Sequence, residues 1–439
     1  MMKFFFMIIF FIVFLNFEFK KFMNQNLIFL MSFMFLFMNF GIKMKFYMIS
    51  YLFGLDKYSY GLILLVFWIF GLLFLSLSFN MIEMKFCMFL LNFLMLILMI
   101  CFSSLNYFLF YLYFEVSLIP TFIMIVYWGL MSERLSACYY MFFYTMMFSL
   151  FLLILMFKIN KMYGTFCLFL LFFNSIKMKG LYYLIFMMSF LVKIPMFMLH
   201  SWLLKAHVEA PLFGSMVLAS LLLKLGGYGI LRFLMINYLI EFNNLIISIS
   251  LYGCLILSIT CINQVDLKVL VAYSSIVHMG LMLGGMMTLF KLGILGGYLM
   301  MISHGLCSSG MFYMVNVNYE RLNSRLILIN KGILLLMPSM GMWWFLMCSS
   351  NMAAPFSLNL ISEIMLISSL LIYEMSLIFI LFFICLLSFF YSLNLFSFIF
   401  HGMSMKTLMF NSGKINEFLS LLLHWLPLNL FIFNLSFLM

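Results

Sequence analysis

The stretch KIPMFMLHSWLLKAHVEAPLFGSMVLASLLLKLGGYG, residues 193–229, decides the fold, because it places ionisable groups within an otherwise almost entirely apolar chain. Lys193 and Lys224 stand inside apolar runs, and Pro195 and Pro211 interrupt the helical pattern between them. A charged side chain within a bilayer is costly, so it normally faces a bundle interior or a watery path. The stretch therefore predicts a membrane-embedded bundle with a polar interior.

The two lysines differ in how easily they could reach water. Lys193 could snorkel from a helix end, and the segment from Lys205 to Glu209 could form a solvated loop. Lys224 cannot reach water in this way, because a helix over residues 212–232 places it roughly 12 Å from the nearer end of a bilayer core about 30 Å thick. We predict that Lys224 is buried and exchanges protons, since burial disfavours the charged form of an amine.

Composition excludes a soluble domain. Of the 439 residues, 67% are hydrophobic and 8% are charged, whereas a soluble domain is typically about a quarter charged. The 60 Phe and 47 Met are typical of an AT-rich genome and indicate an organelle gene. The net charge of +11 does not indicate a nucleic-acid partner, because the lysines are dispersed between apolar runs. The nine cysteines form no CxxC pair, and no His or Cys cluster has zinc-like spacing.

Apolar runs long enough to cross or nearly cross a bilayer recur along the chain. They cover approximately residues 4–17, 24–40, 59–80, 86–103, 106–128, 138–157, 181–201, 211–232, 245–263, 269–290, 294–317, 328–348, 357–373, 376–399 and 419–437. They predict an all-α polytopic membrane protein with about fourteen transmembrane helices, the first at the N-terminus, where no small-residue cleavage site follows. The apolar piece at residues 165–173 could be re-entrant or interfacial. Two helices should be broken, one near Pro195 and one at Pro355, where irregular backbone must line a cavity or be buried in protein.

Four further ionisable residues fall at depth within these runs. Glu115 lies roughly 13 Å into its run; it could be a neutral, hydrogen-bonded side chain, but we interpret it as a carboxylate coupled to a buried lysine. Glu363 lies near the middle of its run if that run is a half-helix. His278 could be a packing residue or a proton carrier. His304 is predicted to carry protons, because imidazole takes both protonation states near neutral pH.

The glycine-rich segment LGGYG, residues 225–229, follows no strand and lacks the spacing of a phosphate-binding loop. It favours close helix packing instead. We find no nucleotide site in the sequence.

Eight strings in order along the chain carry a family resemblance. They are YFEVSLIP (113–120), SERLSACYYMFFYT (132–145), FLVKIP (190–195), LHSWLLKAHVEAP (199–211), GSMVLASLLLKLGGYG (214–229), QVDLKVLVAYSSIVHMG (264–280), SHGLCSSGMF (303–312) and NYERLNSR (318–325). Together they resemble mitochondrial NADH-ubiquinone oxidoreductase chain 4, a family of antiporter-like membrane subunits of respiratory complex I. The resemblance covers about residues 107–365, and only hydropathy extends it to either end.

The resemblance implies a role for each deep ionisable residue. The essential carboxylate of the family corresponds to Glu115 and its partner lysine to Lys193. The central lysine corresponds to Lys224. The connecting histidines correspond to His278 and His304, and the glutamate of the second broken helix to Glu363, so that the catalytic set for proton translocation is Glu115, Lys193, Lys224, His278, His304 and Glu363.

The resemblance also implies an organisation and a setting. It implies an antiporter-like fold with two inverted five-helix repeats, residues 106–235 and 236–400, between N-terminal helices at 1–105 and a C-terminal loop and helix at 401–439. The chain would be a multi-pass protein of the mitochondrial inner membrane, with other membrane-arm subunits, neighbouring antiporter-like subunits and lipid as partners. It would carry no cofactor, since NAD, FMN, the Fe-S clusters and ubiquinone belong to other subunits of the complex.

Two departures and two alternatives accompany this interpretation. Leu204 and Ser132 stand where the family usually has proline; Leu204 leaves open how sharply the chain turns before Lys205. A stand-alone cation/proton antiporter subunit would share the same motifs. A passive scaffold, whose buried charges only hold helices together, is the structural alternative.

Overall fold

The computed structural model describes residues 6–9, 21–37, 52–77, 81–129, 131–173, 180–236, 240–402 and 412–435. Within these ranges the chain is helical, and its only β-type pairings are three isolated bridges. Most of the expected run at 4–17 and the ends of the runs at 24–40, 59–80 and 419–437 lie outside the described residues.

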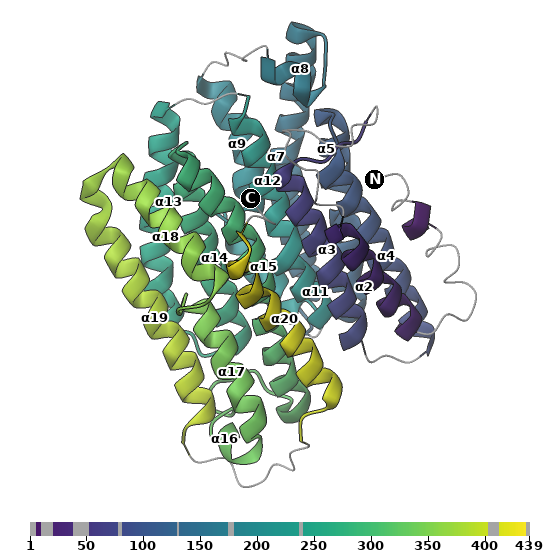
Figure 1. Cartoon of the computed structure of the whole chain (residues 1–439), viewed down its shortest axis with the longest axis vertical. Helices are drawn as coiled ribbons and strands as arrows, with labels where there is room; N and C mark the ends of the chain where they lie inside the picture. Colours follow the sequence, from purple (N-terminus) through teal and green to yellow (C-terminus); the bar gives the residue numbers. More distant parts are fainter. Residues whose placement is uncertain are drawn as a thin grey trace.

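The helices form one bundle of roughly parallel and antiparallel segments (Figure 1). They are α2 (Lys21–Phe37), α3 (Lys57–Ser76), α4 (Met81–Ser103), α5 (Tyr107–Val116), α6 (Leu118–Trp128), α7 (Arg134–Tyr163), α8 (Leu168–Phe173), α9 (Gly180–Lys193), α10 (Ser201–Glu209), α11 (Leu212–Val217), α12 (Leu223–Leu234), α13 (Ile240–Ile262), α14 (Leu267–Met287), α15 (Lys291–Leu322), α16 (Ile333–Leu336), α17 (Pro338–Asn351), α18 (Leu358–Tyr373), α19 (Ile378–Phe400) and α20 (Ile415–Phe433).

Ten helical spans in the described ranges are long and apolar enough to cross a membrane, and α2, α9 and α18 are shorter apolar helices. The prediction of an all-α polytopic membrane protein is confirmed. The number of about fourteen transmembrane helices stays a prediction. The six residues of α8 are too few to cross a bilayer, whose core is about 30 Å thick.

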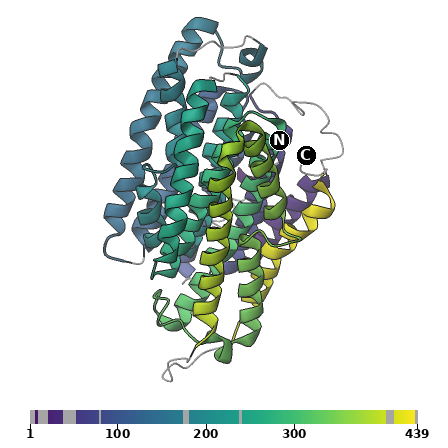
Figure 2. The same ribbon diagram turned by 90° about the vertical axis from the view of Figure 1, so that its left-hand side faces the viewer.

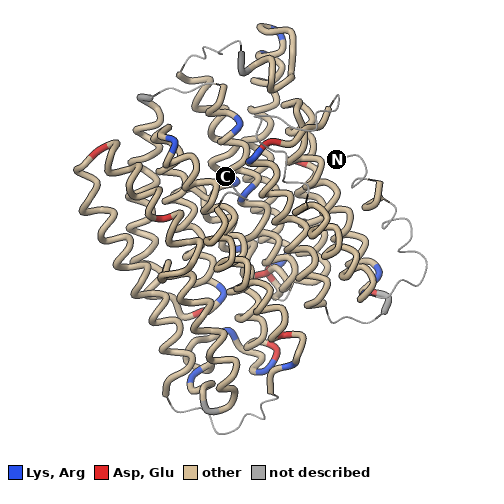
Figure 3. The backbone as a smooth tube through the Cα atoms, in the orientation of Figure 1, with Lys and Arg blue, Asp and Glu red and all other residues tan. Residues whose placement is uncertain are grey.

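The bundle has an interior and an outer layer of helices. In the most apolar 18-residue stretch of each span, all residues are buried for the span that includes α11 and α12, and 89% are buried for α3 and α14. In the corresponding stretches of the spans that include α7 and α19, only 33% and 28% of the residues are buried. Figure 2 shows α7 along one outer edge. The outer helices expose large apolar side chains such as Phe143 and Phe379, as expected of lipid-facing surfaces. Charged residues are sparse on the whole bundle (Figure 3).

Both expected helix breaks are present. The helix α9 ends at Lys193 and α10 begins at Ser201, while α17 ends at Asn351 and α18 begins at Leu358. Each break contains a residue other than glycine in the left-handed region, with φ of 75° at Met198 in the first and 56° at Ala353 in the second. Such residues are uncommon and strained, and they persist only where surrounding packing holds them.

Several boundaries differ from the sequence-based expectation. The run at 328–348 is not one helix, because Pro338 starts α17 anew and separates it from the single turn of α16. The run at 106–128 is interrupted at Ser117, between α5 and α6. In each of these two runs, the two helical segments follow one another directly along the chain.

The glycine-rich segment packs closely, as the sequence predicts, and it brings α12 against the first break. A methyl group added at Gly226 would lie 3.0 Å from the backbone nitrogen of Ile194 and 3.1 Å from the carbonyl oxygen of Phe190. Because these are backbone atoms, the neighbouring segment would have to move. Gly226 therefore fixes the distance between α12 and the break that follows Lys193.

We expect Gly226→Ala to destabilise the protein by about 1–3 kcal/mol through overpacking. The measurement is the thermal inactivation midpoint of the membrane-bound protein. Gly284→Ala is the matched control, because its added methyl would lie no closer than 3.4 Å to its neighbours. Equal midpoints for the two variants would contradict the close approach at Gly226.

Candidate functional site

The first pair of expected site residues meets at the break between α5 and α6. The Lys193 ammonium donates a hydrogen bond of 2.7 Å to the carbonyl of Phe114, the residue before Glu115. Glu115 lies within electrostatic reach of Lys193. Its two carboxylate oxygens are buried and have no hydrogen-bond partner among the described residues. The lysine and the carboxylate are therefore neighbours that do not pair directly in this conformation.

The second lysine is completely enclosed and occupies a local change of helix type. Residues Leu218–Leu222 form a π-helical turn between α11 and α12, a feature often found at functional sites. The Lys224 ammonium donates to the carbonyl of Ala219, five residues earlier, at 2.6 Å. It also lies 3.0 Å from Nδ1 of His304 on α15. The predicted burial of Lys224 is confirmed, at 0% exposure.

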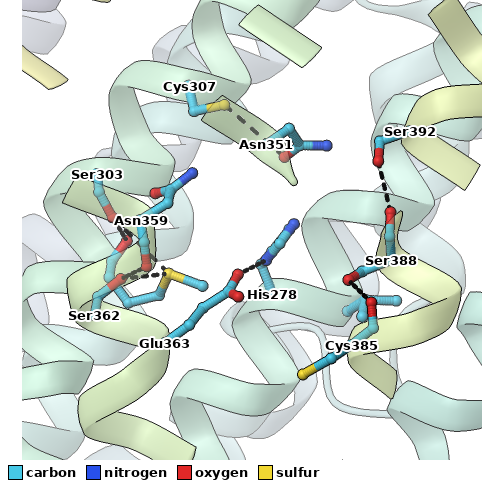
Figure 4. Close-up of polar contacts among 12 residues, drawn as sticks. His278, Ser303, Cys307, Asn351, Asn359, Ser362, Glu363, Cys385, Ser388 and Ser392 are labelled. Atoms are coloured by element: carbon cyan, nitrogen blue, oxygen red, sulfur yellow. Dashed lines mark hydrogen bonds and ion pairs between the residues drawn. The ribbon is translucent and has the colours of Figure 1, made fainter. Parts of the chain in front are cut away.

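The remaining expected residues continue the line from His304. The rings of His304 and His278 are 5.7 Å apart between centroids. On the far side, Nδ1 of His278 lies 3.2 Å from Oε1 of Glu363, as Figure 4 shows. Glu363 is on the half-helix α18, as the sequence predicts. Four of the six expected residues thus form a line of neighbours from Lys224 of α12 to Glu363 of α18.

Polar side chains from α14, α15, α17 and α19, and from α18 itself, lie around Glu363 (Figure 4). Asn359 of α18 donates to the carbonyl of Ser350 at 2.7 Å, across the second helix break. The oxygen of the Asn359 side chain and the hydroxyl of Tyr391 are buried without a hydrogen-bond partner among the described residues. Buried polar atoms of this kind normally bind ordered water. The surroundings of Glu363 at this break are therefore polar.

The segment from Lys205 to Glu209 is not the solvated loop that sequence reasoning allowed. It belongs to α10, and only Lys205 is exposed, where its ammonium lies 3.5 Å from the ring centroid of Tyr140. His207 is fully buried and stacks on Phe312, with ring centroids 4.7 Å apart. The signal that could have revealed this helix is the spacing of its apolar residues, which fall on one helical face.

The sequence analysis also missed the cations at the end of α10. The Lys268 ammonium donates to the carbonyl of Ala210 at 2.5 Å, and the Arg325 guanidinium donates to that of Val208 at 2.8 Å. Positive groups at a helix C-terminus are favourable, because the last carbonyls carry partial negative charge. These contacts hold the C-terminal end of α10 in place.

A buried ion pair was missed as well. The Arg232 guanidinium lies 2.8 Å from Oδ1 of Asp56, the N-cap residue of α3, and it also donates to the hydroxyl of Tyr228. The hydroxyl of Tyr107 donates to the carbonyl of Arg232 at 3.0 Å. No periodic pattern links positions 176 residues apart, so sequence alone gave no signal. This network fixes the end of α12, the helix that carries Lys224.

The arrangement has a definite chemical capability. Lysine, histidine and glutamate side chains can each accept and release a proton, and here they follow one another inside an apolar bundle. No group of three or more His, Cys, Asp or Glu side chains within the described ranges could hold a metal ion. Neighbouring ionisable side chains of this kind could pass a proton from one to the next.

Comparison with known proteins identifies the family. Residues 1–103 match NADH-ubiquinone oxidoreductase chain 4, amino terminus, and residues 104–390 match the NADH:quinone oxidoreductase/Mrp antiporter transmembrane family. The chain is 47% identical to NADH-ubiquinone oxidoreductase chain 4 of Aedes aegypti over 100% of this chain and 99% of that protein. It is 47% identical to that of Ceratitis capitata over 93% of both chains. The chain belongs to the NADH-ubiquinone oxidoreductase chain 4 family.

Solved structures show the fold of this family. A chain of respiratory complex I from Thermus thermophilus superimposes with a TM-score of 0.89, at 20% identity, over 98% of this chain and 96% of that chain. A chain of the Mrp complex from Dietzia sp. superimposes with a TM-score of 0.73, at 16% identity, over 80% and 68%. The antiporter-like fold with two broken helices is confirmed.

The buried ion pair at the end of α12 leads to a stability prediction. Asp56→Ala leaves the Arg232 charge buried without its carboxylate, and we expect a loss of about 3–5 kcal/mol. The measurement is the amount and thermal midpoint of assembled protein. Asp266→Ala is the control, because Asp266 begins α14 without a side-chain capping bond. An Asp56→Ala protein as stable as the Asp266→Ala protein would show that the pair is dispensable.

Proposed function

We propose that the chain is a proton-translocating core membrane subunit of respiratory complex I and thereby part of a proton-pumping NADH:ubiquinone oxidoreductase. It is a multi-pass protein of the mitochondrial inner membrane, and its partners are the other membrane-arm subunits, including neighbouring antiporter-like subunits. The observation that carries this proposal is the line from Lys224 through His304 and His278 to Glu363, whose neighbouring side chains lie close enough for proton transfer directly or through water. Family membership supports the same conclusion.

Protons move along this line by transfer between neighbouring side chains. Glu115 modulates the charge on Lys193, which passes its proton toward Lys224. From Lys224 the proton moves to His304 at a contact of 3.0 Å, then by way of His278 to Glu363. We propose that the second break is the water-accessible end of the line, because Glu363 lies there among polar side chains. NAD, FMN, the Fe-S clusters and ubiquinone belong to other subunits, and this chain contributes proton transfer alone.

The energies of these steps are compatible with pumping. Moving one elementary charge against 100 mV costs about 2.3 kcal/mol. Two opposite charges 4 Å apart interact by about 4 kcal/mol at an effective dielectric constant of 20. Making or breaking one ion pair, such as that between Lys193 and Glu115, therefore changes the energy enough to drive a proton along the line.

The line spans two proposed repeats. Residues 106–235 hold Glu115, Lys193 and Lys224, and residues 236–400 hold His278, His304 and Glu363. Residues 1–105 and 401–439 flank them. Each repeat contains one broken helix, the arrangement in which transporters place their ion sites.

A stand-alone cation/proton antiporter subunit is the competing function. The fold is compatible with it, because the Mrp complex shares the architecture. The identity of 47% to insect chain 4 proteins favours complex I. Co-purification with NADH-oxidising subunits tests the choice directly, since an antiporter subunit would purify without them.

Replacing the first carboxylate tests its coupling to Lys193. Glu115→Gln preserves the shape of the side chain and removes the charge, so we expect normal assembly with roughly tenfold or greater loss of proton pumping and linked quinone reductase activity. The measurement is pumping by inner-membrane vesicles, normalised to complex content. Glu133→Gln is the control, because Glu133 is exposed and makes no capping bond. Normal pumping by an assembled Glu115→Gln complex would rule out this role.

Replacing the central lysine separates a proton carrier from a passive scaffold. Arginine keeps the positive charge but stays protonated at every accessible pH. We expect Lys224→Arg to assemble and to pump at least about tenfold more slowly, with Lys224→Ala showing the effect of losing the charge as well. The exposed Lys205 offers the control Lys205→Arg, which should pump normally. Wild-type pumping by Lys224→Arg would favour the scaffold.

A further inference from the structure

The Lys193 ammonium is held by one residue through two different groups. Its hydrogen bond of 2.7 Å goes to the carbonyl of Phe114, and it lies 3.3 Å from the centroid of the Phe114 ring. An ammonium over an aromatic face is attracted by the negative potential of the ring, most strongly where water is excluded. Lys193 and Phe114 are both buried, so this condition is met.

The ring itself is fixed by its neighbours. Phe114 packs edge-on against Phe190 of α9, with centroids 5.8 Å apart, and against Phe110 at 5.6 Å. Phe190 precedes Lys193 by three residues on the same helix, so the two side chains lie on one face. The ring is therefore held in the position that it needs to contact the ammonium.

Glu115 forms no ion pair with Lys193 in this conformation. The only ion pairs among the described residues join Arg232 to Asp56, His278 to Glu363 and Arg321 to Glu417. The Glu115 oxygens accept no hydrogen bond there either. The groups that face Lys193 electrostatically are Glu115 on α5 and Cys101 on α4.

We infer that Phe114 is a positioning residue that holds the Lys193 ammonium apart from Glu115, so that the pair forms only when the ammonium leaves the aromatic ring. This inference rests on the proposed function of the Glu115 and Lys193 pair. It gives that pair two discrete arrangements, because the ammonium is bound either by Phe114 or by the adjacent carboxylate. A modulating carboxylate needs such an open state, since a permanently closed pair would keep the lysine charged.

The test removes the aromatic face and then restores it. Phe114→Leu keeps the backbone carbonyl and loses the ring, and we expect the balance to move toward the closed pair by roughly 5- to 30-fold, with slower proton pumping by assembled complex. Phe114→Tyr keeps the aromatic face and should restore pumping. Phe186→Leu is the matched control, because Phe186 is a buried phenylalanine of α9 that contacts aromatic rings and, among the described residues, no cation.

A double substitution separates this inference from the proposed function. With Glu115→Gln in place there is no carboxylate to compete, so adding Phe114→Leu should reduce pumping no further. If Glu115→Gln alone pumps normally, the proposed function fails. If Glu115→Gln pumps poorly but Phe114→Leu matches Phe186→Leu, or Phe114→Tyr gives no rescue, only the role of Phe114 is overturned.

A measurement on the unaltered complex covers the case in which Phe114→Leu does not assemble. Structures of the wild-type complex in its resting and turnover states should place the Lys193 ammonium either over the Phe114 ring or within 4 Å of a Glu115 oxygen. A state in which both contacts exist together would overturn the inference, because the ring would then not oppose pairing.

Discussion

The structure depends on how a positive charge is accommodated inside an apolar bundle. Each of three buried lysines, Lys193, Lys224 and Lys268, donates to a backbone carbonyl. Each carbonyl lies at an irregularity of a helix: the junction of α5 and α6, the π-helical turn before α12, and the C-terminal end of α10. A regular helix uses its carbonyls internally, so irregular backbone is what makes these partners available.

A carbonyl partner has a different consequence from a carboxylate partner. When a lysine that is paired with a carboxylate loses its proton, a negative charge is left uncompensated, which is costly in a medium of low dielectric constant. A carbonyl carries no net charge, so Lys193 and Lys224 can become neutral without stranding a counter-charge. By contrast, Arg232 has the Asp56 carboxylate as a partner at 2.8 Å, and that ion pair has a structural role. A carbonyl partner therefore suits a lysine that exchanges protons, whereas a carboxylate partner suits a cation that holds helices together.

The sequence predicted what depends on local pattern and depth. The rise of a helix placed Lys224 in the interior, and Pro195 and Pro355 marked the two breaks. The π-helical turn could not be predicted, because its residues, LASLL, have no pattern that distinguishes them from an ordinary apolar helix. The pairing of Arg232 with Asp56 depends on packing between distant helices, and the buried half-helix α10 resembled a loop because it is short and polar. Proline and hydropathy predict where a helix stops but do not predict what packs against it.

Glycines of two neighbouring helices allow a close approach to the first helix break. A methyl group at Gly253 of α13 would lie 2.3 Å from Cβ of Phe197, so α13 approaches the break as closely as a glycine allows. On the other side, Gly226 of α12 contacts the same break at Ile194. Met198, with a positive φ of 75°, lies in this break directly after Phe197. Because the break directly follows Lys193, the position of this lysine is set by the glycines of two helices that carry neither it nor Glu115.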